Sequence, residues 1–592
     1  MKKTNRILSL VVAASMMLGL TGCGSSAYST GSSASGGATA STAASSSAAG
    51  SAASSSSSGA ASGSQATAST TAEAGTEDLN VMLETPVESL DPQQATDGTS
   101  FEVIADYTDG LMQMDADGKA VNAIAESYEE SDDSLTWTFH LREDAKWSNG
   151  EPVTAADFVF GWQRAVDPDV ASEYSYMLSD IGQVKNAADI IAGKKDKSEL
   201  GVTAVDEHTL KVELEAPVSY FLSLMYFPTF YPVNEKFYDT CKDTFGTSPE
   251  TTLSNGAFVL DKYEPAATEF HLTKNADYYD ADRVKLAGID YQVIQDSQTA
   301  LMSYQNGELD TTLVNGDQVD QVKDDPEFKA VGAGYMWYVS PNISKVKELQ
   351  NENIRKALTF AIDREAIATD ILKDGSTPTY TAVPPQFAAG PDGSDFSADQ
   401  DKFKDVCASD AAKAADYWKQ GLSELGVDSI TLEMVVDADD APQKVATVLQ
   451  EQWQTNLPGL TVSIKVEPKK QRVQDMQDGN FELGLTRWGP DYADPMTYLG
   501  MWVTDNSNNY GLWTNADYDS IIAECTTGET ATDPEKRWTR LYDAEQLVMN
   551  EAVIFPLYTQ CNAEMIKSNV TGIEYHPVAL NRVYKDTVKA AQ

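Results

Sequence analysis

The sequence predicts an α/β fold. Residues 430–436 and 460–466 have the length and the apolar, β-branched content of strands, and residues 442–457 between them have helical spacing. A strand, a helix and a second strand in this order imply a parallel strand pair, because parallel strands need a long crossover connection. Helical and strand-like segments also alternate along the rest of the folded region, which favours the α/β class.

The first part of the folded region, which starts near Asp78, opens with a strand at residues 79–83 and continues into a helical stretch at about 101–111. Residues 135–141 alternate between apolar and polar side chains, which is typical of a half-buried strand. Thr154 and Asp157 have the spacing of a capping box just before an aromatic-rich segment, so they predict the start of a helix.

Further elements follow along the chain. We expect two short strands within residues 205–214, with a turn at 206–207, and a turn followed by a strand at 254–260. Residues 353–371 carry apolar side chains at core spacing, among them Ile354, Ala357 and Leu358, so they predict one continuous helix.

The chain is strongly acidic. Its 592 residues include 43 Lys and Arg against 90 Asp and Glu, a formal net charge of −47. A surface of this sign repels phosphate backbones and anionic lipid headgroups, so we expect no nucleic-acid partner. The simplest interpretation of the acidity is a well-solvated surface.

The cysteines and histidines predict neither a metal site nor a cofactor. No CxxC pair occurs and no histidine lies near a cysteine in the sequence. Cys241, Cys407, Cys525 and Cys561 could form up to two disulfides or remain buried thiols. The four histidines, at positions 140, 208, 271 and 576, lie mostly beside strand-like residues, which favours structural roles.

Enzyme motifs are also missing from the folded region. It contains no HExxH, P-loop or GxSxG sequence, so we expect no enzyme. A pair of carboxylates of the glycosidase type remains open in a chain with 90 acids. Residues 115–118 and 437–440 resemble calcium loops, but their spacing does not fit an EF-hand, and we interpret both as solvated turns.

The N-terminus has the features of a bacterial lipoprotein signal. Basic residues are followed by an apolar run at about 7–20, which is too short for a helix that spans a bilayer. Residues 20–23, Leu-Thr-Gly-Cys, resemble a lipobox. This resemblance implies that residues 1–22 are a signal peptide and that Cys23 carries a diacylglycerol, with lipid as the only membrane attachment.

A tether is predicted between the anchor and the folded region. From residue 24 to residue 72 nearly every side chain is Gly, Ala, Ser or Thr, a composition that cannot bury a core. We therefore expect residues 23–77 to comprise the lipidated cysteine and a disordered linker. Its root-mean-square span of roughly 35–42 Å would keep a folded domain close to a partner in the same membrane.

Several segments of the folded region resemble one protein family when they are taken together and in order. They are Ser89-Leu90-Asp91-Pro92, residues 132–159, residues 254–258, residues 353–358 with 362–364, and the run Trp488-Gly489-Pro490-Asp491-Tyr492-Ala493-Asp494-Pro495. The set resembles the OppA/DppA-like oligopeptide- and dipeptide-binding proteins of ABC importers, the bacterial extracellular solute-binding protein family 5.

This resemblance implies a periplasmic-binding-protein-like architecture with two α/β lobes, a hinge and an inserted third domain. Lobe I would comprise residues 78–108, 233–333 and 558–592. The inserted domain would comprise residues 109–232, and lobe II residues 334–557.

The resemblance also implies a binding site for an extended peptide. Family members pair the Asp of the Trp-Gly-x-Asp-Tyr motif with the peptide's α-amino group, and that residue is Asp491 here. Around it, the expected ligand-binding residues are Arg487, Trp488, Gly489, Pro490 and Tyr492 on lobe II, and Asp97 and Gly98 on lobe I. For Trp488 and Tyr492, a place in the pocket wall and a place in the core both remain open.

One departure bears on peptide length. Some members place an arginine before the tryptophan to bind the carboxylate of a short peptide, and that position is Leu485 here, with Arg487 two residues out of register. Longer peptides are therefore expected.

The implied function is capture of oligopeptides by lobe closure and delivery to an ABC permease. The protein would be a monomer on the outer face of the bacterial cytoplasmic membrane. The alternatives are the same fold with an oligosaccharide, a nickel complex or haem as ligand, or a tethered structural adhesin.

Overall fold

The structure of the chain is a computed structural model that describes residues 77–116, 118–528 and 530–591. The predicted signal peptide, Cys23 and almost all of the predicted linker lie outside the described residues. Among the described helices, none combines the length and the apolar character needed to cross a membrane.

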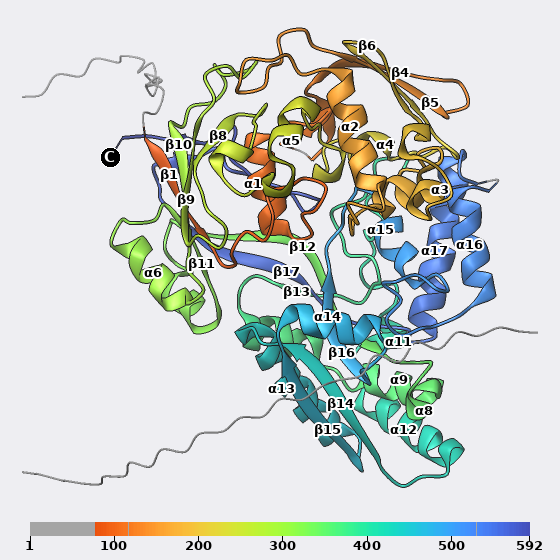
Figure 1. Cartoon of the computed structure of the whole chain (residues 1–592). Coiled ribbons are helices and arrows are strands. Elements are labelled where there is room, and N and C mark those ends of the chain that lie inside the picture. The colour runs from red at the N-terminus through yellow and green to blue at the C-terminus, as the bar shows by residue number, and fades with distance from the viewer. Residues whose placement is uncertain (1–76, 117, 529, 592) are drawn as a thin grey trace, which may run out of the picture. The chain divides into compact units, whose positions relative to one another are not determined.

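An eleven-stranded mixed sheet runs through the described chain (Figure 1), which confirms the predicted α/β class. Its strands, in spatial order, are β15 (Leu460–Glu467), β14 (Ile430–Asp437), β16 (Leu483–Trp488), β12 (Phe328–Pro341), β17 (Phe555–Ile566), β11 (Thr311–Val314), β1 (Asp78–Leu83), β10 (Gly288–Val293), β9 (Glu269–Lys274) and β8 (Phe258–Lys262), with β13 (Thr377–Pro378) paired to β17.

Smaller sheets complete the β-structure. A four-stranded sheet has the order β4 (Ala125–Glu130), β5 (Thr136–Leu141), β7 (Thr209–Glu213), β6 (Val202–Asp206). The short pairs are β2 (Met112–Met114) with β3 (Ala120–Asn122), β18 (Val570–Thr571) with β21 (Val588–Lys589), and β19 (Glu574–Tyr575) with β20 (Arg582–Val583).

Helices of four residues or more cover the sheets. They are α1 (Gly98–Tyr107), α2 (Ala155–Val166), α3 (Ala187–Ile191), α4 (Phe221–Leu224), α5 (Glu235–Cys241), α6 (Ser297–Gln305), α7 (Val319–Val322), α8 (Lys347–Gln350), α9 (Glu352–Phe360), α11 (Lys404–Cys407), α12 (Ala411–Leu425), α13 (Asp440–Asn456), α14 (Lys469–Gln477), α15 (Met496–Leu499), α16 (Ala516–Thr526) and α17 (Pro534–Asn550).

The predicted strand–helix–strand unit is present. β14 and β15 pair in parallel over eight residues each, with α13 between them in the chain. β14 alternates between buried and exposed side chains at its start and becomes fully buried where it approaches β16. The predicted capping box of α2 is also present, since Thr154 and Asp157 satisfy each other's backbone groups.

Two local expectations were wrong. The turn between β6 and β7 lies at Glu207 and His208, one residue later than expected. The single helix expected over residues 353–371 is broken after α9, because the Asp363 side chain accepts a hydrogen bond from the Ala366 N–H and starts a new helix, α10 (Arg364–Ala366), which runs into a π-helical turn at Ile367–Leu372. The apolar spacing continues across this break, so periodicity alone does not reveal it.

Two long strands, β12 and β17, connect the two ends of the large sheet (Figure 1). β17 pairs with β11 through its last residues, and β12 pairs with β16 through its own last residues. The two strands also pair with each other along these stretches, from Phe328 to Gly332 and from Met336 to Val339 of β12, with irregularities between Gly332 and Met336 and between Trp337 and Tyr338. A pair of strands shared by two halves of a sheet has the form of a hinge.

The buried side chains form two large clusters and two small ones. The second large cluster packs α9, α12 and α13 against β14, β15 and β16, and the first contains most of the other buried side chains. The division into lobes at the residues given above stays a prediction. All four cysteines in the described chain, at positions 241, 407, 525 and 561, are free thiols, so the alternative without disulfides holds in this structure.

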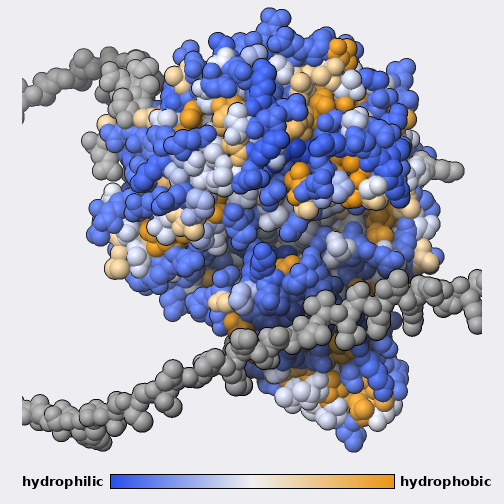
Figure 2. Space-filling view, in the orientation of Figure 1, coloured by the Kyte–Doolittle hydropathy of each residue, from blue (hydrophilic) through white to orange (hydrophobic). Residues whose placement is uncertain are grey.

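The face of the molecule that Figure 2 shows is mainly polar, with hydrophobic side chains in separate groups. Single exposed apolar side chains are normal on a protein surface.

Candidate functional site

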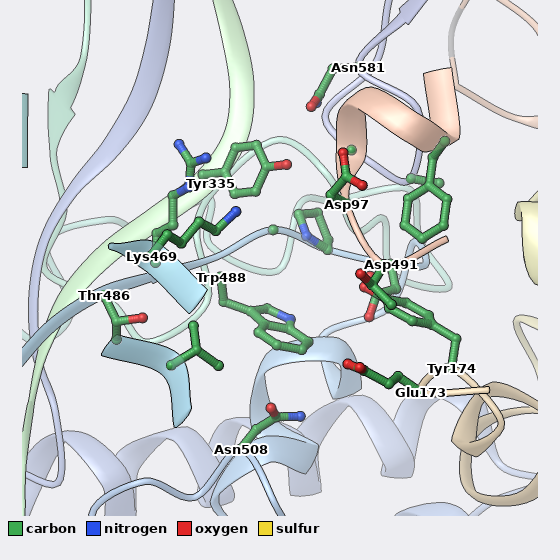
Figure 3. A pocket seen from close by; sticks show the side chains of 18 of the residues that line it. Asp97, Glu173, Tyr174, Tyr335, Lys469, Thr486, Trp488, Asp491, Asn508 and Asn581 are labelled. Carbon is green, nitrogen blue, oxygen red and sulfur yellow. The ribbon is translucent and has the colours of Figure 1, made fainter. Parts of the chain in front are cut away.

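A large cavity lies where strand β16, the start of helix α1, helix α14 and residues 173–176 come together (Figure 3). It contains about 1280 Å³ of space that no protein atom fills, including space open to solvent. Seven of the eight sequence-predicted ligand-binding residues line it, namely Asp97, Gly98, Arg487, Trp488, Gly489, Pro490 and Asp491. Their roles toward a ligand stay predictions.

Strand β16 offers an open backbone edge to this cavity. On one side it pairs with β12 along its whole length, from Leu483 to Trp488. On the other side it pairs with β14 at Leu483 and Gly484. Within the described chain, residues 485–488 therefore have no strand partner on that second side. An unpaired edge of this kind can accept an extended peptide as an additional strand.

Asp491 follows this edge and is held in place by its neighbours. Its backbone N–H donates to Thr497 Oγ1 at 3.2 Å, and its carboxylate accepts a hydrogen bond from Tyr176 Oη at 3.2 Å. Residues 176 and 491 are 315 positions apart, so this contact joins distant parts of the chain. The carboxylate is partly accessible from the cavity.

The surroundings of Asp491 disfavour its charge. Burial raises the pKa of Asp491 to about 7, and the hydrogen bond from Tyr176 opposes this shift without cancelling it. Among the residues that the structure describes, no cationic side chain contributes to lowering the pKa of Asp491. An ammonium group placed beside it would supply that charge and form a short, charge-assisted hydrogen bond.

Arg487 is already engaged by protein groups. Its guanidinium stacks over Tyr335 at 4.4 Å and over Trp337 at 5.4 Å, and its Nη1 donates to Gln560 Oε1 at 2.9 Å. Gln560 Oε1 also accepts a hydrogen bond from Trp337 Nε1. These contacts orient Arg487 as part of the cavity wall.

Gly489 and Pro490 contact other parts of the cavity wall. A Cβ at Gly489 would lie 2.5 Å from Cε1 of Tyr335, so the missing side chain makes room for this ring. Gly489, an expected ligand-binding residue, therefore also has a packing role. The carbonyl of Pro490 accepts a hydrogen bond from the Ala579 N–H at 3.0 Å, which ties the loop to residues 577–581.

The two aromatic residues of the motif have different positions. Trp488 lines the cavity and is half-buried, with Nε1 directed at Thr497 Oγ1, 3.5 Å away. Tyr492 is the one predicted residue that does not line the cavity. It is 1% exposed and stacks on Tyr220 with ring centroids 4.6 Å apart, which resolves the open alternative for Tyr492 in favour of the core.

Asp97 and Gly98 form part of the opposite wall. Asp97 is the N-cap of α1 and accepts hydrogen bonds from the backbone N–H and the hydroxyl of Ser100, at 3.0 and 2.6 Å. A Cβ at Gly98 would lie 3.3 Å from the Tyr335 hydroxyl. The start of α1 and the end of β16 thus face the same space from segments almost 400 residues apart in the sequence.

The sequence did not single out several charged and aromatic residues of the cavity. Figure 3 shows Lys469 and Tyr335 toward one end and Glu173, Tyr174 and Asp491 toward the other. The ammonium of Lys469 and the carboxylate of Asp491 thus lie toward opposite ends of the cavity, an arrangement that suits a dipolar guest. None of these residues except Asp491 belongs to the motifs quoted above, so only their arrangement in space reveals them.

Arg472 also lines the cavity and corrects an expectation. It is 2% exposed and binds Asp437 in a two-pronged ion pair, at 2.8 and 3.2 Å, while its Nη1 donates to Thr486 Oγ1. Asp437 is itself buried, so the interpretation of residues 437–440 as a solvated turn was wrong at its first residue.

The chemistry of the lining favours organic over metal-containing guests. Of the described residues that line the cavity, none is a histidine or a cysteine. These are the side chains that hold haem iron and nickel most often. Carboxylate, guanidinium, ammonium, hydroxyl and aromatic groups remain, and they suit a polar organic ligand with charged ends.

Comparisons with known proteins agree with this geometry. A "Dipeptide-binding protein" of Lactococcus lactis subsp. cremoris is 35% identical over 520 residues, covering 85% of this chain and 93% of its own. The structure described as "Listeria monocytogenes OppA bound to peptide" is 36% identical with a TM-score of 0.77, covering 88% of this chain and 100% of its own. That of "Haemophilus influenzae OppA complex with RPPGFSPFR" is 28% identical with a TM-score of 0.76, covering 87% and 99%.

The family assignment follows from a match to a family as a whole. Residues 119–510, more than half of the 592-residue chain, match the family described as bacterial extracellular solute-binding proteins, family 5 Middle. The relatives above cover the folded region on both sides of this segment. The chain belongs to the bacterial extracellular solute-binding proteins of family 5.

Proposed function

We propose that this chain is a binding protein, not an enzyme, that captures oligopeptides outside the cell and delivers them to an ABC permease. The observation that carries the proposal is Asp491, a carboxylate with a raised pKa beside an open strand edge in a cavity of about 1280 Å³. The peptide's ammonium would pair with Asp491, and its backbone would add to β16.

A site of this kind binds the chemical groups that all peptides share. Backbone N–H and C=O groups and a terminal ammonium occur in every peptide, so binding to them does not select a sequence. The remaining cavity space can hold water, and bridging waters tolerate side chains of different shapes. The peptide-bound relatives from Listeria and Haemophilus support an extended guest in this fold.

The guest is longer than a dipeptide. Leu485 occupies the position at which some family members place an arginine for the carboxylate of a short peptide, and it is fully buried in the second core cluster. Arg487 is committed to Gln560 and to two aromatic rings. The ligand named for the Haemophilus relative, RPPGFSPFR, has this greater length.

The location follows from the N-terminal sequence. We propose that Cys23 carries the lipid anchor after removal of residues 1–22, and that the linker up to residue 77 lets a monomeric binding domain reach a permease in the same membrane. Closure of the two lobes around the peptide would present the loaded form to the permease.

The test separates the contribution of the ammonium from that of the rest of the peptide. Peptides of two to ten residues, free and N-acetylated, are titrated calorimetrically into the wild type and Asp491→Asn, with oligosaccharides as a further arm. We expect Asp491→Asn and N-acetylation each to weaken binding by about 30-fold or more, since removing one partner of a desolvated charge pair costs about 2–5 kcal/mol. Together they should cost little more than either alone, because both remove the same contact.

Glu173→Gln provides the matched control. Glu173 is another carboxylate in the cavity wall, but it is exposed. Its removal should change affinity by less than about 3-fold, as is usual for a solvated charge. Equal binding of free and N-acetylated peptides by the wild type, or tight binding of an oligosaccharide in place of any peptide, would refute the proposed ligand.

A further inference from the structure

Four side chains that could form a metal site converge on the solvent-facing side of the large sheet, away from the cavity. Asp78 on β1, His271 on β9 and Asp290 on β10 each offer one ligand atom, and these atoms all lie within 4.8 Å of one another. The fourth residue, Asp261 near the end of β8, contacts His271. None of the four lines the peptide cavity.

The sheet register brings these residues to one face. Asp290 lies directly opposite His271, and Asp78 lies directly opposite Gly288, two residues before Asp290 on the same strand. Directly opposed residues share a face, and so do residues two apart. The three side chains therefore come from three adjacent strands and stand side by side, on a rigid scaffold.

Two backbone features shape the cluster. A Cβ at Gly288 would lie 2.6 Å from Nε2 of His271 and 2.9 Å from Oδ1 of Asp78, so the glycine leaves the space into which both groups reach. The β8–β9 ladder shifts register between Leu260 and Lys262, which places Asp261 in a bulge. A bulge re-aims side chains, and here the carboxylate of Asp261 reaches the histidine of the next strand.

The separations fit a coordinated ion. His271 Nε2 and Asp78 Oδ1 are 3.8 Å apart. Two ligands of a tetrahedral Zn²⁺ lie roughly 3.3–3.6 Å apart, given bond lengths of about 2.0–2.2 Å. Movement of a few tenths of an ångström, within reach of half-exposed side chains, would bring both atoms onto one ion. Asp290 would supply a third ligand from the same face, and water the fourth.

The contact between His271 and Asp261 resembles the one that metal-ligating histidines make through the ring nitrogen that does not bind the metal. Nδ1 of His271 lies 2.6 Å from Oδ1 of Asp261. If Nδ1 carries the proton and donates it to Asp261, the lone pair of Nε2 faces Asp78 and Asp290 and is free to coordinate. Metal sites repeatedly use a carboxylate in this outer position to fix the ring and its tautomer.

We propose that Asp78, His271 and Asp290 bind a divalent transition metal ion, with Zn²⁺ the best fit, and that Asp261 orients His271. An imidazole with two carboxylates suits the ions that accept mixed nitrogen and oxygen ligands, whereas Ca²⁺ and Mg²⁺ prefer six or more oxygens. The ion would reduce the mutual repulsion of three carboxylates around one ring. It would also join three neighbouring strands near the point where the folded region begins.

The sequence alone gave no sign of this site. The expectation of no metal site relied on ligand spacing along the chain, while these ligands come from positions 78, 271 and 290. Only strand pairing brings them together.

The test measures Zn²⁺ binding to the mature protein after treatment with EDTA. A peptide that binds the protein is added at a saturating concentration. ZnCl₂ is titrated and the bound metal is counted by elemental analysis. We expect the wild type to bind one equivalent of Zn²⁺, and His271→Ala and Asp290→Asn to bind none. Asp261→Asn should weaken Zn²⁺ binding by about 10–100-fold. A rise in the melting temperature with Zn²⁺, and no comparable rise with Mg²⁺, should accompany binding.

His140→Ala is the matched control. His140 is also a strand histidine with a nearby carboxylate, Glu129 at 3.7 Å, but it lacks the further acids. Its substitution should leave the Zn²⁺ equivalent in place. The proposal is overturned if the wild type retains no Zn²⁺, or if His271→Ala and Asp290→Asn, folded by circular dichroism, retain as much as the wild type. Absence of Zn²⁺ from the wild type would mean that His271 only makes polar contacts with the acids around it.

Discussion

The protein surroundings of Asp491 and a bound ammonium group favour opposite protonation states of its carboxyl group. Its surroundings favour the protonated form, and burial raises its pKa to about 7. A bound ammonium requires the ionised form. Without a guest, the Asp491 carboxyl is therefore close to its titration midpoint at neutral pH, and a cationic guest shifts it to its charged form. Such perturbed groups are typical of functional sites.

This conflict predicts a bell-shaped dependence of peptide affinity on pH. Below pH 7 the Asp491 carboxyl must lose a proton before it can pair, so affinity should fall by up to about 10-fold per pH unit there. Above about pH 8 the peptide's α-amino group, with an ordinary pKa of about 7.7–8.0, loses its charge and affinity should fall again. Calorimetric titrations from pH 5 to pH 9 would measure both limbs.

The controls for this prediction follow from the same chemistry. Asp491→Asn should lose the acid limb, and N-acetylated peptide should lose both limbs. Glu102 and Asp106 titrate in the same pH range, because burial raises their pKa values to about 7 and about 8. The variant must therefore be compared with the wild type. An acid limb of equal size in Asp491→Asn would assign it to those residues instead.

The stability of the peptide-free protein should move in the opposite direction. A carboxyl with a raised pKa in the folded state contributes stability that is present in full below pH about 4 and is lost as the pH rises through about 7. Asp491→Asn removes this loss. The substitution that weakens peptide binding should therefore stabilise the peptide-free protein at pH 8, by at most about 4 kcal/mol.

The sequence could identify Asp491 because it lies in a run of eight residues with a recognisable pattern. It could not identify Tyr176, whose contact with Asp491 depends on the fold, or the stacking that withdraws Tyr492 from the cavity. Part of that pattern is structural, since Asp494 forms a two-pronged buried ion pair with Arg537. A motif thus marks the place of a site more securely than it assigns the role of each residue.

At the scale of elements, the irregular part of β12 packs tightly against the segment that contains Pro577. Gly334 has φ +73°, a conformation that favours glycine, and a Cβ there would lie 2.0 Å from the carbonyl oxygen of Pro577. Its own carbonyl accepts a hydrogen bond from Tyr498 Oη at 2.9 Å. Pro577 lines the cavity, so this one position links the proposed hinge to the binding site.

Gly334→Ala should therefore impair both folding stability and peptide binding. The steric conflict is with backbone, which cannot move as easily as a side chain, so we expect a loss of more than about 1 kcal/mol in unfolding free energy and at least a several-fold loss of affinity. Chemical denaturation and calorimetry would measure the two effects.

Gly332→Ala is the control for this prediction, because no atom lies within 4 Å of the position of its Cβ and its backbone is outside the left-handed region. It should behave like the wild type. Equal effects of the two substitutions would show that any added side chain in β12 is harmful and that Gly334 has no special part.

The elements that the sequence predicted well are those with local signals. The capping box of α2 and the parallel pair of β14 and β15 each depend on residues close together in the chain. The break after α9 was missed because the apolar spacing continues across it and Asp363 was not recognised as the N-cap of α10. Arg364, which is 1% exposed, adds contacts across the fold by donating to the carbonyls of Pro556 and Cys407.

At the scale of the whole molecule, peptide binding should make the protein more compact. The cavity is lined by the start of α1, by residues 173–176 and by β16, which belong to different predicted domains. A peptide that touches all of these segments binds best when they are close together, so it must shift the population toward the closed form.

Small-angle scattering of the mature protein would measure this change as a decrease in the radius of gyration at saturating peptide. The predicted linker contributes equally with and without peptide, so the difference reports on the folded region. N-acetylated peptide should give a smaller decrease at the same concentration, because it lacks the ammonium that pairs with Asp491. If the radius of gyration stays unchanged at proven saturation, the peptide binds a molecule that is already closed. Delivery to a permease would then depend only on opening of the lobes.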